Sequence, residues 1–354
     1  MAYPTLRQNE VISALYNQII SINTESKNIA GVYGKLLEAM KVDGGMYGDT
    51  LLKIETDALE SYDFLADTSD QCNVLALHRP PEPNTQAFVV DTFRQIAVTL
   101  DDYMSKRAFS DEGSFGQFNG VVRGWVGDTK KVHDATTFNA FVGTAKSAEV
   151  AENISIDFDD YTSVGQGLGE VIANLLIELG DVSRDYNDLG FLRSYDENDI
   201  IICWNSNYVN HIKKVDMPAL FNKEGLVDKL DSYVLPARYF GDVNTSAITA
   251  ANNAGTMRSL IEKDYTVSGA TKHVFAGDLI PAGVAIAANE SYTPNAKVIC
   301  KVMCNGSVPF CSSFSVGTSF VNPKNLSENQ YLTWSYNTLA YRKGLPYITI
   351  KEEE

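Results

Sequence analysis

The sequence has 354 residues and a formal net charge of -16, and 44% of its residues are hydrophobic. A chain of this kind can bury a substantial core, and its length favours two subdomains over one small domain. No run approaches the roughly 18 to 20 consecutive apolar residues that a membrane span needs. The polar start MAYPTLRQNE also lacks the pattern of a secretory signal, so we expect a soluble protein made in the cytoplasm. The acidic balance argues against a general electrostatic grip on nucleic-acid phosphates.

The first 43 residues have the pattern of two helices. Apolar residues recur at three- and four-residue steps over residues 7–22 and again from Ile29 to Met40. Thr24 can cap the second helix, and Asp43-Gly44-Gly45 can end it. Because short helices are marginal alone in water, this segment needs something to pack on. The simplest interpretation is a helical hairpin that completes the core of its own chain.

Between Gly48 and Asp102 the pattern changes from helical to strand-like. Apolar residues alternate with polar ones over Leu52 to Thr56 and again from Phe88 to Leu100, whereas residues 64–85 are rich in turn-forming types. This predicts a long two-stranded excursion with an elaborate tip. Since an isolated hairpin is marginally stable in water, we expect this excursion to lie on a partner. A lid folded back on its own domain is the alternative.

Residues 110–146 are predicted to form one long helix. Ser110 is a plausible N-cap, and the two acidic residues after it suit the positive end of a helix dipole. An apolar stripe recurs at helical spacing, but the helix also carries several glycines and could break near Gly127. Glycines spaced by four residues would let another backbone approach closely. The packing residues predicted for this helix are Gly116, Phe118, Gly120, Val122, Gly124 and Trp125.

The remainder of the chain mixes helix and strand patterns. A short strand is predicted at Ile154–Phe158, followed by a helix with a broad apolar face at Ser163–Asp188. The uninterrupted apolar run Ile200–Cys203 predicts a buried central strand. Residues 233–290 are looser, with a turn at Pro281-Ala282-Gly283. Further strands are predicted at residues 297–303, 314–321, 331–336 and 347–350.

No group of residues stands out as a catalytic or metal centre. The stretch from Asp185 to Asp196 resembles a calcium loop, but Leu189 stands where an oxygen ligand is required, which favours an ordinary turn. The cysteines are odd in number and lack a nearby histidine, so packed, reduced thiols are the simpler interpretation. The four histidines are scattered. The sequence therefore predicts no catalytic residues, no metal and no cofactor, and it argues against an enzyme.

The order of these elements resembles the Hong Kong 97-type fold of tailed-phage major capsid proteins. Two stretches narrow the resemblance to the small short-tailed phages, Picovirinae-like podoviruses. Residues 79–122, which include the segment RQIAVTLDDY, are similar to the family's outgoing loop arm and the start of its spine helix. Residues 199–226, DIIICWNSNYVNHIKKVDMPALFNKEGL, are similar to the family's strand, short helix and Ala-Phe-Asn segment.

The resemblance implies an α+β chain with an N-terminal helical arm, an extended β-hairpin loop, a long spine helix, and peripheral and axial domains. The implied parts are the arm at residues 1–43, the extended loop at 44–102, the spine helix and peripheral strands at 103–165, the axial domain at 166–296 and returning peripheral strands at 297–354. The stretch at 244–290 has no counterpart that we can match.

The resemblance further implies a structural protein of the virion that assembles in the host cytoplasm. Copies would form pentamers and hexamers of an icosahedral shell around double-stranded DNA, without sequence-specific binding, and with scaffolding and portal proteins as further partners. The loop would lie across one neighbour and the arm would clasp another. Candidate contact residues, chosen as charges and aromatics with little core beneath them, are Phe64, Arg79, Phe88, Arg94, Tyr103, Lys106 and Arg107.

Two other classes of protein stay open on the sequence alone. A tail or fibre component of a phage would also be rich in strands, but it would be expected to form trimers. A soluble enzyme with residues 48–100 as a lid is the second alternative, for which the sequence offers no catalytic set.

Overall fold

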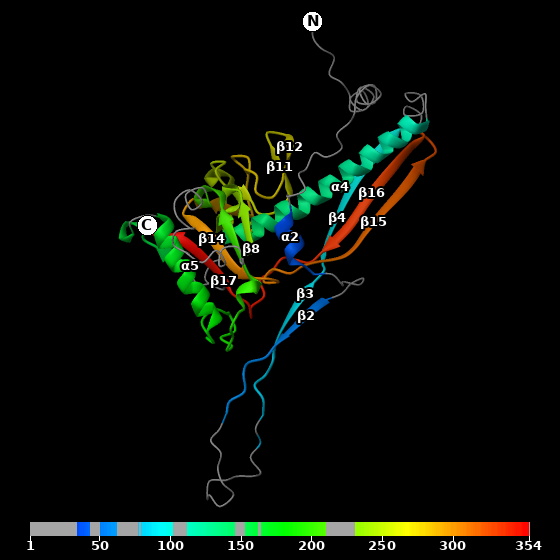
Figure 1. Cartoon of the computed structure of the whole chain (residues 1–354). Coiled ribbons are helices and arrows are strands. Elements are labelled where there is room, and N and C mark those ends of the chain that lie inside the picture. The colour runs from blue at the N-terminus through cyan, green and yellow to red at the C-terminus, as the bar shows by residue number, and fades with distance from the viewer. Residues whose placement is uncertain are drawn as a thin grey trace, which may run out of the picture. The chain divides into compact units, whose positions relative to one another are not determined.

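A computed structural model gives the fold of the chain (Figure 1). It describes residues 34–42, 50–61, 77, 79–101, 112–145, 153–161, 164–209 and 231–353. The chain divides into two compact units, each of which is assembled from separate stretches of sequence. Unit 1 takes Met1–Asp49, Val89–Phe138 and Phe310–Thr338, and unit 2 takes Thr50–Phe88, Asn139–Pro309 and Leu339–Glu354.

Unit 1 is built on a four-stranded sheet in the order β1-β15-β16-β4. The long strands β15 (Phe310–Asn322) and β16 (Ser327–Tyr336) form an antiparallel pair, and β4 (Thr92–Asp101) runs antiparallel to β16 along its whole length. The short strand β1 (Lys41–Val42) is parallel to the start of β15. In Figure 1 these long strands run beside the helix α4 (Glu112–Gly143).

The helix α4 confirms the predicted spine helix, but it runs unbroken through Gly127, so the break considered there is wrong. A single glycine inside a helix costs about 1 kcal/mol relative to alanine, and the many backbone hydrogen bonds of a long helix compensate for this cost. The expected N-cap, Ser110, lies outside the described residues. Phe138 is fully buried, and its ring meets that of Phe310 edge-on at 6.2 Å, which packs the helix on the sheet.

Of the predicted N-terminal arm, the structure describes one short helix, α2 (Lys35–Met40), and the rest lies outside the described residues. Its N-cap residue, Gly34, has a φ of 88°, a left-handed conformation that glycine adopts without strain. A Cβ at this position would lie 3.6 Å from the Cβ of Ala135, so the start of α2 sits against α4. Leu36 and Met40 are buried in unit 1, as the helical pattern predicts.

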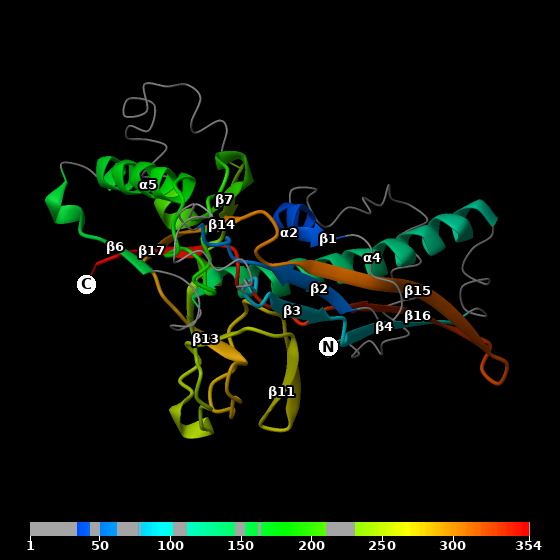
Figure 2. The same cartoon turned by 90° about the horizontal axis from the view of Figure 1, so that it is seen from below.

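Unit 2 is built on a five-stranded sheet in the order β6-β17-β14-β7-β8. Every residue of β7 and β14 is buried, as expected for central strands. Figure 2 shows α5 beside this sheet. The strands are β6 (Asn153–Ile156), β17 (Tyr347–Glu352), β14 (Val298–Cys304), β7 (Ile200–Asn205) and β8 (Asp231–Leu235).

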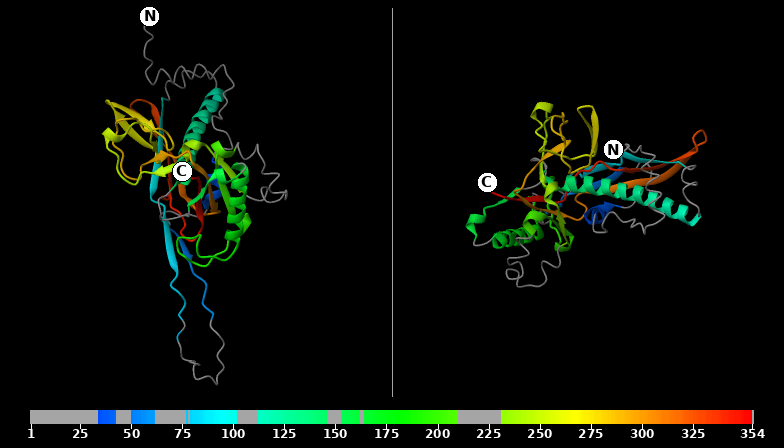
Figure 3. Two further views of the ribbon diagram at one scale, coloured as in Figure 1. Left: turned by 90° about the vertical axis from the view of Figure 1, so that its left-hand side faces the viewer. Right: turned by 90° about the horizontal axis from the view of Figure 1, so that it is seen from above.

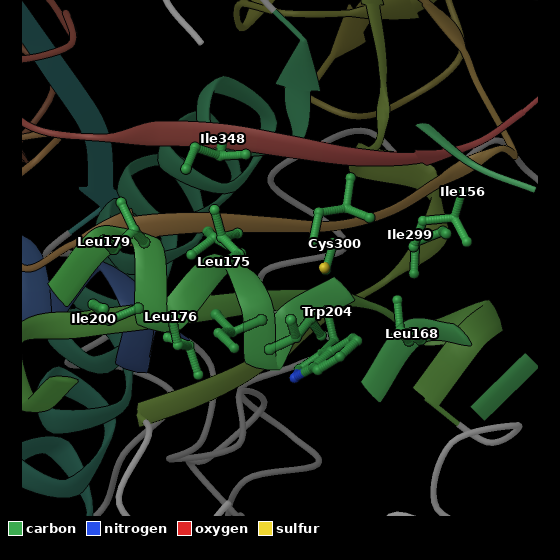
Figure 4. Packing of buried hydrophobic residues seen from close by; sticks show 14 of the residues in the cluster. Ile156, Leu168, Leu175, Leu176, Leu179, Ile200, Trp204, Ile299, Cys300 and Ile348 are labelled. Carbon is green, nitrogen blue, oxygen red and sulfur yellow. The ribbon is translucent and has the colours of Figure 1, made fainter. Parts of the chain in front are cut away.

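The helix α5 (Val164–Gly180) covers one face of the five-stranded sheet. Its leucines point into a cluster with residues of β7, β14 and β17, as Figure 4 shows. The predicted helix extended to Asp188, which is wrong, because α5 ends at Gly180 and Val182 beyond it is 56% exposed. Glycine has the weakest helix propensity after proline, and the chain turns away behind it.

The segment without a counterpart in the resemblance, residues 244–290, contributes a hairpin and one strand, β10, of a second, smaller sheet. The sheet has the order β10-β13-β9-β5, and the hairpin pairs β11 with β12. The hairpin turns at Ser268 and Gly269, whose φ values of 50° and 83° suit a type I′ turn. The strands are β5 (Thr144–Ala145), β9 (Gly241–Val243), β10 (Arg258–Ser259), β11 (Lys263–Val267), β12 (Ala270–Val274) and β13 (Ser291–Pro294). Short 3-10 helices span Phe158–Asp160, Glu197–Asp199, Ala237–Tyr239 and Ala250–Asn252.

The predicted excursion is present as two strands, β2 (Thr50–Glu55) and β3 (Asn84–Val89), which pair with each other (Figure 3, left). Its predicted end at residue 100 or 102 is wrong, because β4 pairs with β16 in the sheet of unit 1. Residues 297–354, predicted as returning peripheral strands, are divided between the two units. There, β15 and β16 join unit 1, whereas β14 and β17 complete the five-stranded sheet of unit 2.

Candidate assembly surfaces

The paired strands β2 and β3 expose apolar side chains. Leu52 is 53% exposed and Ile54 is 61% exposed on β2, and Val89 is 47% exposed at the end of β3. Burial of such side chains stabilises a hairpin, and without it a two-stranded sheet is marginal in water. This surface is therefore suited to be covered by another polypeptide.

The base of the excursion is tied to unit 2 through Asp57, two residues after β2. One carboxylate oxygen of Asp57 lies 2.7 Å from Nη1 of Arg184, and the other accepts a hydrogen bond of 2.9 Å from the backbone N–H of Leu192. These two contacts, led by the bond from Arg184, hold the pKa of Asp57 down at about 2. The strand is thus tied down by a carboxylate that stays ionised at any pH near neutrality.

The second strand is tied down by Gln86 of β3. Its amide Nε2 donates to the carbonyl of Tyr341 over 2.6 Å, and its Oε1 accepts from the backbone N–H of Lys343 over 3.0 Å. The carbonyl of Lys343 in turn accepts from the N–H of Asp188 over 2.9 Å. Both strands of the excursion are therefore anchored to the rest of unit 2.

The outer face of the sheet in unit 1 carries no charged residue from Phe93 to Thr99 of β4, and the register places Asp101 at the end of that face. Cross-strand partners in a sheet share a face. The registers β15·β16 and β16·β4 therefore place, among others, ten described side chains on the face away from α4. Phe93 and Phe320 are each 62% exposed there, and Val316 is 41% exposed. The ten are Phe93, Gln95, Ala97, Thr99, Val316, Thr318, Phe320, Asn329, Tyr331 and Thr333.

The inner face of the same sheet holds α4 through buried polar side chains. Trp334 Nε1 donates to Asp134 over 3.0 Å, and the carboxylate of Asp134 also accepts from Lys130 Nζ over 2.9 Å. His133 Nε2 lies 3.0 Å from the hydroxyl of Tyr336. These polar contacts were not predicted from the sequence, because only apolar residues at helical spacing indicate the packed face of a helix.

A groove of about 500 Å³ separates part of α4 from the hairpin of β15 and β16 in unit 1. Residues that line the groove include Val126, Gly127, Gly317, Ser319, Gln330 and Leu332.

At the end of α4, another part of the chain lies so close to Gly143 that only glycine fits there. A Cβ at Gly143 would stand 2.8 Å from the carbonyl carbon of Tyr239, too close for any side chain. Among the described residues, a Cβ at Gly120 or Gly124 would meet nothing within 4 Å, so the close approach of another backbone to these two stays a prediction. Trp125 of the predicted apolar stripe is 38% exposed. The surroundings of Gly116, Phe118 and Val122 lie outside the described structure.

Of the seven predicted contact residues, the structure describes three, and these differ in exposure. Phe88 is 2% exposed, so its choice as an exposed aromatic is wrong, and Phe93 is the exposed aromatic that the prediction missed. Arg79 is exposed, and Arg94 is half-buried on the side of β4 that faces α4. The prediction chose Arg94 and not Phe93, although adjacent residues of a strand point to opposite faces of the sheet. Phe64, Tyr103, Lys106 and Arg107 lie outside the described residues.

The candidate chemical groups behave as structural side chains. Cys203, Cys300, Cys304 and Cys311 are buried free thiols, and burial raises the pKa of Cys203 and Cys304 to about 12. No three His, Cys, Asp or Glu side chains among the described residues are grouped so that they could hold a metal ion. Within the same residues, no helix is long and apolar enough to cross a membrane.

The loop that resembled a calcium site is held by its own side chains. Asn187 accepts from the N–H of Phe191 over 2.9 Å and donates to the carbonyl of the same residue over 2.7 Å. Asp196 accepts from the N–H of Asn198 over 2.9 Å, as the cap of a 3-10 helix. These polar groups are used within the turn, in agreement with the simpler interpretation of the sequence.

The family model of the Phi29-like phage major capsid protein matches residues 2–346, almost the whole chain. The chain belongs to the Phi29-like phage major capsid protein family. It is thus a phage major capsid protein, a structural component of the virion, as the order of its elements predicted. No curated protein sequence matches it.

Solved structures agree on the fold of this capsid protein. A chain in the capsid structure of Staphylococcus phage Andhra superposes with a TM-score of 0.64 at 14% identity, covering 94% of this chain and 88% of that chain. A chain in the structure of the head fibre and inner core protein gp22 of native bacteriophage P68 gives 0.57 at 12% identity, with the same coverage. The fold is the Hong Kong 97-type α+β fold. The narrower expectation of a small short-tailed phage stays a prediction.

Proposed function

We propose that copies of this capsid protein form the pentamers and hexamers of a closed icosahedral shell, and that the excursion of residues 50–88 lies on a neighbouring subunit. The exposed apolar surface of β2 and β3 carries this proposal. Leu52 and Ile54 are both more than half exposed on a two-stranded sheet that needs cover. A neighbouring copy supplies that cover in a shell, and the same contact repeats around a closed assembly.

Charge supports the choice of contact surface. Copies that each carry a formal net charge of -16 repel one another, so contacts between them are favoured on uncharged surfaces. The outer face of the unit 1 sheet exposes Phe93 and Phe320 and carries no charged residue from Phe93 to Thr99 of β4, so it meets this requirement. It adds a second surface on which neighbouring copies can meet.

The remaining parts of the proposal follow from the shell. The arm at residues 1–43 clasps another subunit, and the shell encloses double-stranded DNA. The net negative charge lets DNA move along the inner wall without adhering to it. Assembly takes place in the host cytoplasm with scaffolding and portal proteins. The protein has no catalytic activity of its own.

Electron microscopy of the purified protein, combined with sedimentation over a range of concentrations, tests the proposal. We expect closed shells, capsomers or curved sheets, and a sedimentation coefficient that rises with concentration. A monomer at all concentrations, or a closed trimer that grows no further, would refute it.

A further inference from the structure

The clearest feature outside these surfaces is a buried carboxylate at the base of the excursion. Glu55 is the last residue of β2, and it is the one buried residue of that strand, at 6% exposure. Burying an ionised carboxylate is costly unless a cation and hydrogen bonds compensate it. The carboxylate of Glu55 therefore requires partners that hold it in place.

Two arginines from different parts of unit 2 surround Glu55. Arg342 Nε lies 2.6 Å from Oε1, and Arg193 Nη2 lies 3.8 Å from Oε2. The guanidinium of Arg193 also donates to the carbonyl of Thr56 over 3.3 Å. Among the described residues, Oε2 of Glu55 and Nε of Arg193 are both buried without a hydrogen-bond partner. We name Glu55, Arg193 and Arg342 the base clamp.

A glycine makes room for the carboxylate. A Cβ at Gly344 would collide with the carboxylate of Glu55, so no other residue fits there while Glu55 keeps its place. Gly344 directly follows Lys343, whose backbone N–H holds Gln86 of β3. One short segment, residues 342–344, thus fixes β2 through a side chain and β3 through the backbone.

We propose that the base clamp is a positioning device, which sets the direction in which the excursion leaves unit 2 and on which closure of the shell depends. This inference rests on the proposed contact between the excursion and a neighbouring subunit. Glu55 is the last residue of β2, so a tilt of about 10° there moves Thr50, roughly 20 Å away at the other end of the strand, by about 3 Å. A packed interface does not accommodate a shift of that size.

The chemistry of the clamp favours positioning over stability. A buried ion pair contributes little net stability compared with apolar side chains of similar size, but its geometry is demanding. The hydrogen bond of 2.6 Å from Arg342 Nε fixes one carboxylate oxygen, and Arg193 lies on the side of the other. The contacts at Asp57 and Gln86 hold each strand at one point, and the clamp removes the remaining freedom to tilt about those points.

The first experiment measures the direction of the excursion in the unassembled subunit. Spin labels are placed at Leu52→Cys and Ile177→Cys, which are 53% and 72% exposed in unit 2, in a Cys72→Ser background. The other four cysteines are buried. We expect a narrow distance distribution with the clamp intact, and one at least twice as wide in Glu55→Gln. An unchanged width would overturn the proposal.

The second experiment measures shells formed by the same variants without labels. We expect Glu55→Gln to fold with the normal circular dichroism spectrum, but to give open or irregular shells by electron microscopy. The matched control is Glu290→Gln, which removes the ion pair with Lys263 at 2.8 Å elsewhere in unit 2 and should form normal shells. Normal closed shells from Glu55→Gln would overturn the dependence of closure on the clamp.

The outcomes separate this inference from the proposed function. Absence of shells from the unchanged protein contradicts the proposed function, whereas the distance distributions still test the clamp. Should Glu55→Gln fail to fold, Arg193→Gln replaces it, because that change leaves the contact between Glu55 and Arg342 in place. Broadening and open shells in Arg193→Gln would support the proposal, and an unchanged distribution would refute it.

Discussion

Trp334 of β16 donates its indole N–H to Asp134 of α4 over 3.0 Å, and this bond fastens the sheet of unit 1 to the long helix. The other carboxylate oxygen of Asp134 accepts from Lys130, so both oxygens are used at a site that is 7% exposed. His133 and Tyr336 form a second polar contact beside it. The helix is thus held by polar contacts with defined directions as well as by apolar packing.

Trp334→Phe should destabilise unit 1 by about 1 to 3 kcal/mol, because it leaves one buried oxygen of Asp134 without its donor. The free energy of unfolding measured in urea gives the value. Thr129→Ala is the control on the same helix, since the hydroxyl of Thr129 bonds to the carbonyl of Trp125 at an exposed position. That change should stay within about 0.5 kcal/mol of the unchanged protein. Equal effects of the two substitutions would contradict the structural role of the indole bond.

Lys301 is fully buried in β14 and donates to Thr349 over 2.8 Å. Burial lowers the pKa of its ammonium from 10.5 to about 7. In the unfolded chain the ammonium stays protonated up to its ordinary pKa, so folding between pH 7 and 10.5 releases a proton and becomes more favourable as the pH rises. Below about pH 7 the full cost of burying the charge is present.

Lys301→Met should therefore stabilise unit 2 most at and below neutral pH, and the gain should shrink as the pH approaches 10. We expect a gain on the order of 1 to 3 kcal/mol at pH 7, reduced by the lost bond to Thr349. Urea unfolding at several pH values measures the difference between the two proteins. A difference that does not change with pH would contradict the lowered pKa of Lys301.

Gly143→Ala and Gly120→Ala should act in opposite directions. A Cβ at Gly143 would meet the carbonyl carbon of Tyr239 at 2.8 Å, so the substitution should destabilise unit 2 by about 2 kcal/mol or more. A Cβ at Gly120 meets nothing within 4 Å, and replacing an open glycine inside a helix should stabilise it by up to about 1 kcal/mol. Thermal unfolding of each variant decides the sign. If Gly120→Ala blocks shell formation in a folded subunit, a neighbouring copy approaches the helix there.

Leu52→Lys combined with Ile54→Lys should prevent shell formation without unfolding the subunit. Both side chains are exposed in the isolated chain, so lysine is tolerated there, but a charge buried in a contact between copies is costly. Ile177→Lys is the control, because Ile177 is 72% exposed on α5 in the same unit. Light scattering during assembly compares the rate of shell formation of the double variant with that of Ile177→Lys. Shell formation by the double variant at the rate of the control would rule out the contact.

The local elements were predictable from the sequence because their periods are short-range properties. The apolar run at Ile200–Cys203 and the alternation near residues 331–336 each specify a strand without knowledge of its partner. The partners were not predictable in the same way. β4 was assigned to the excursion because it follows β3 directly, whereas Thr92 aligns with Tyr336, far along the chain. Pairing over such a separation leaves no local pattern.

The contact residues were harder to predict than the elements. Phe88 and Phe93 are both aromatic residues near the end of the excursion, and only their burial, 2% against 62%, tells them apart. Glu55 is a charged residue within a strand that alternates, so its sequence indicates a solvent-exposed side chain. Its burial depends on Arg342 and Gly344, which no local signal connects to it.

The strand order of unit 2 also has a consequence for how the chain is made. The strand β6 pairs with β17, where Asn153 aligns with Thr349, roughly 200 residues later, and pairings of such length slow folding. During synthesis, β6 and the apolar face of α5 emerge from the ribosome long before the strand that completes their sheet. The five-stranded sheet of unit 2 therefore stays incomplete until β17 has been translated.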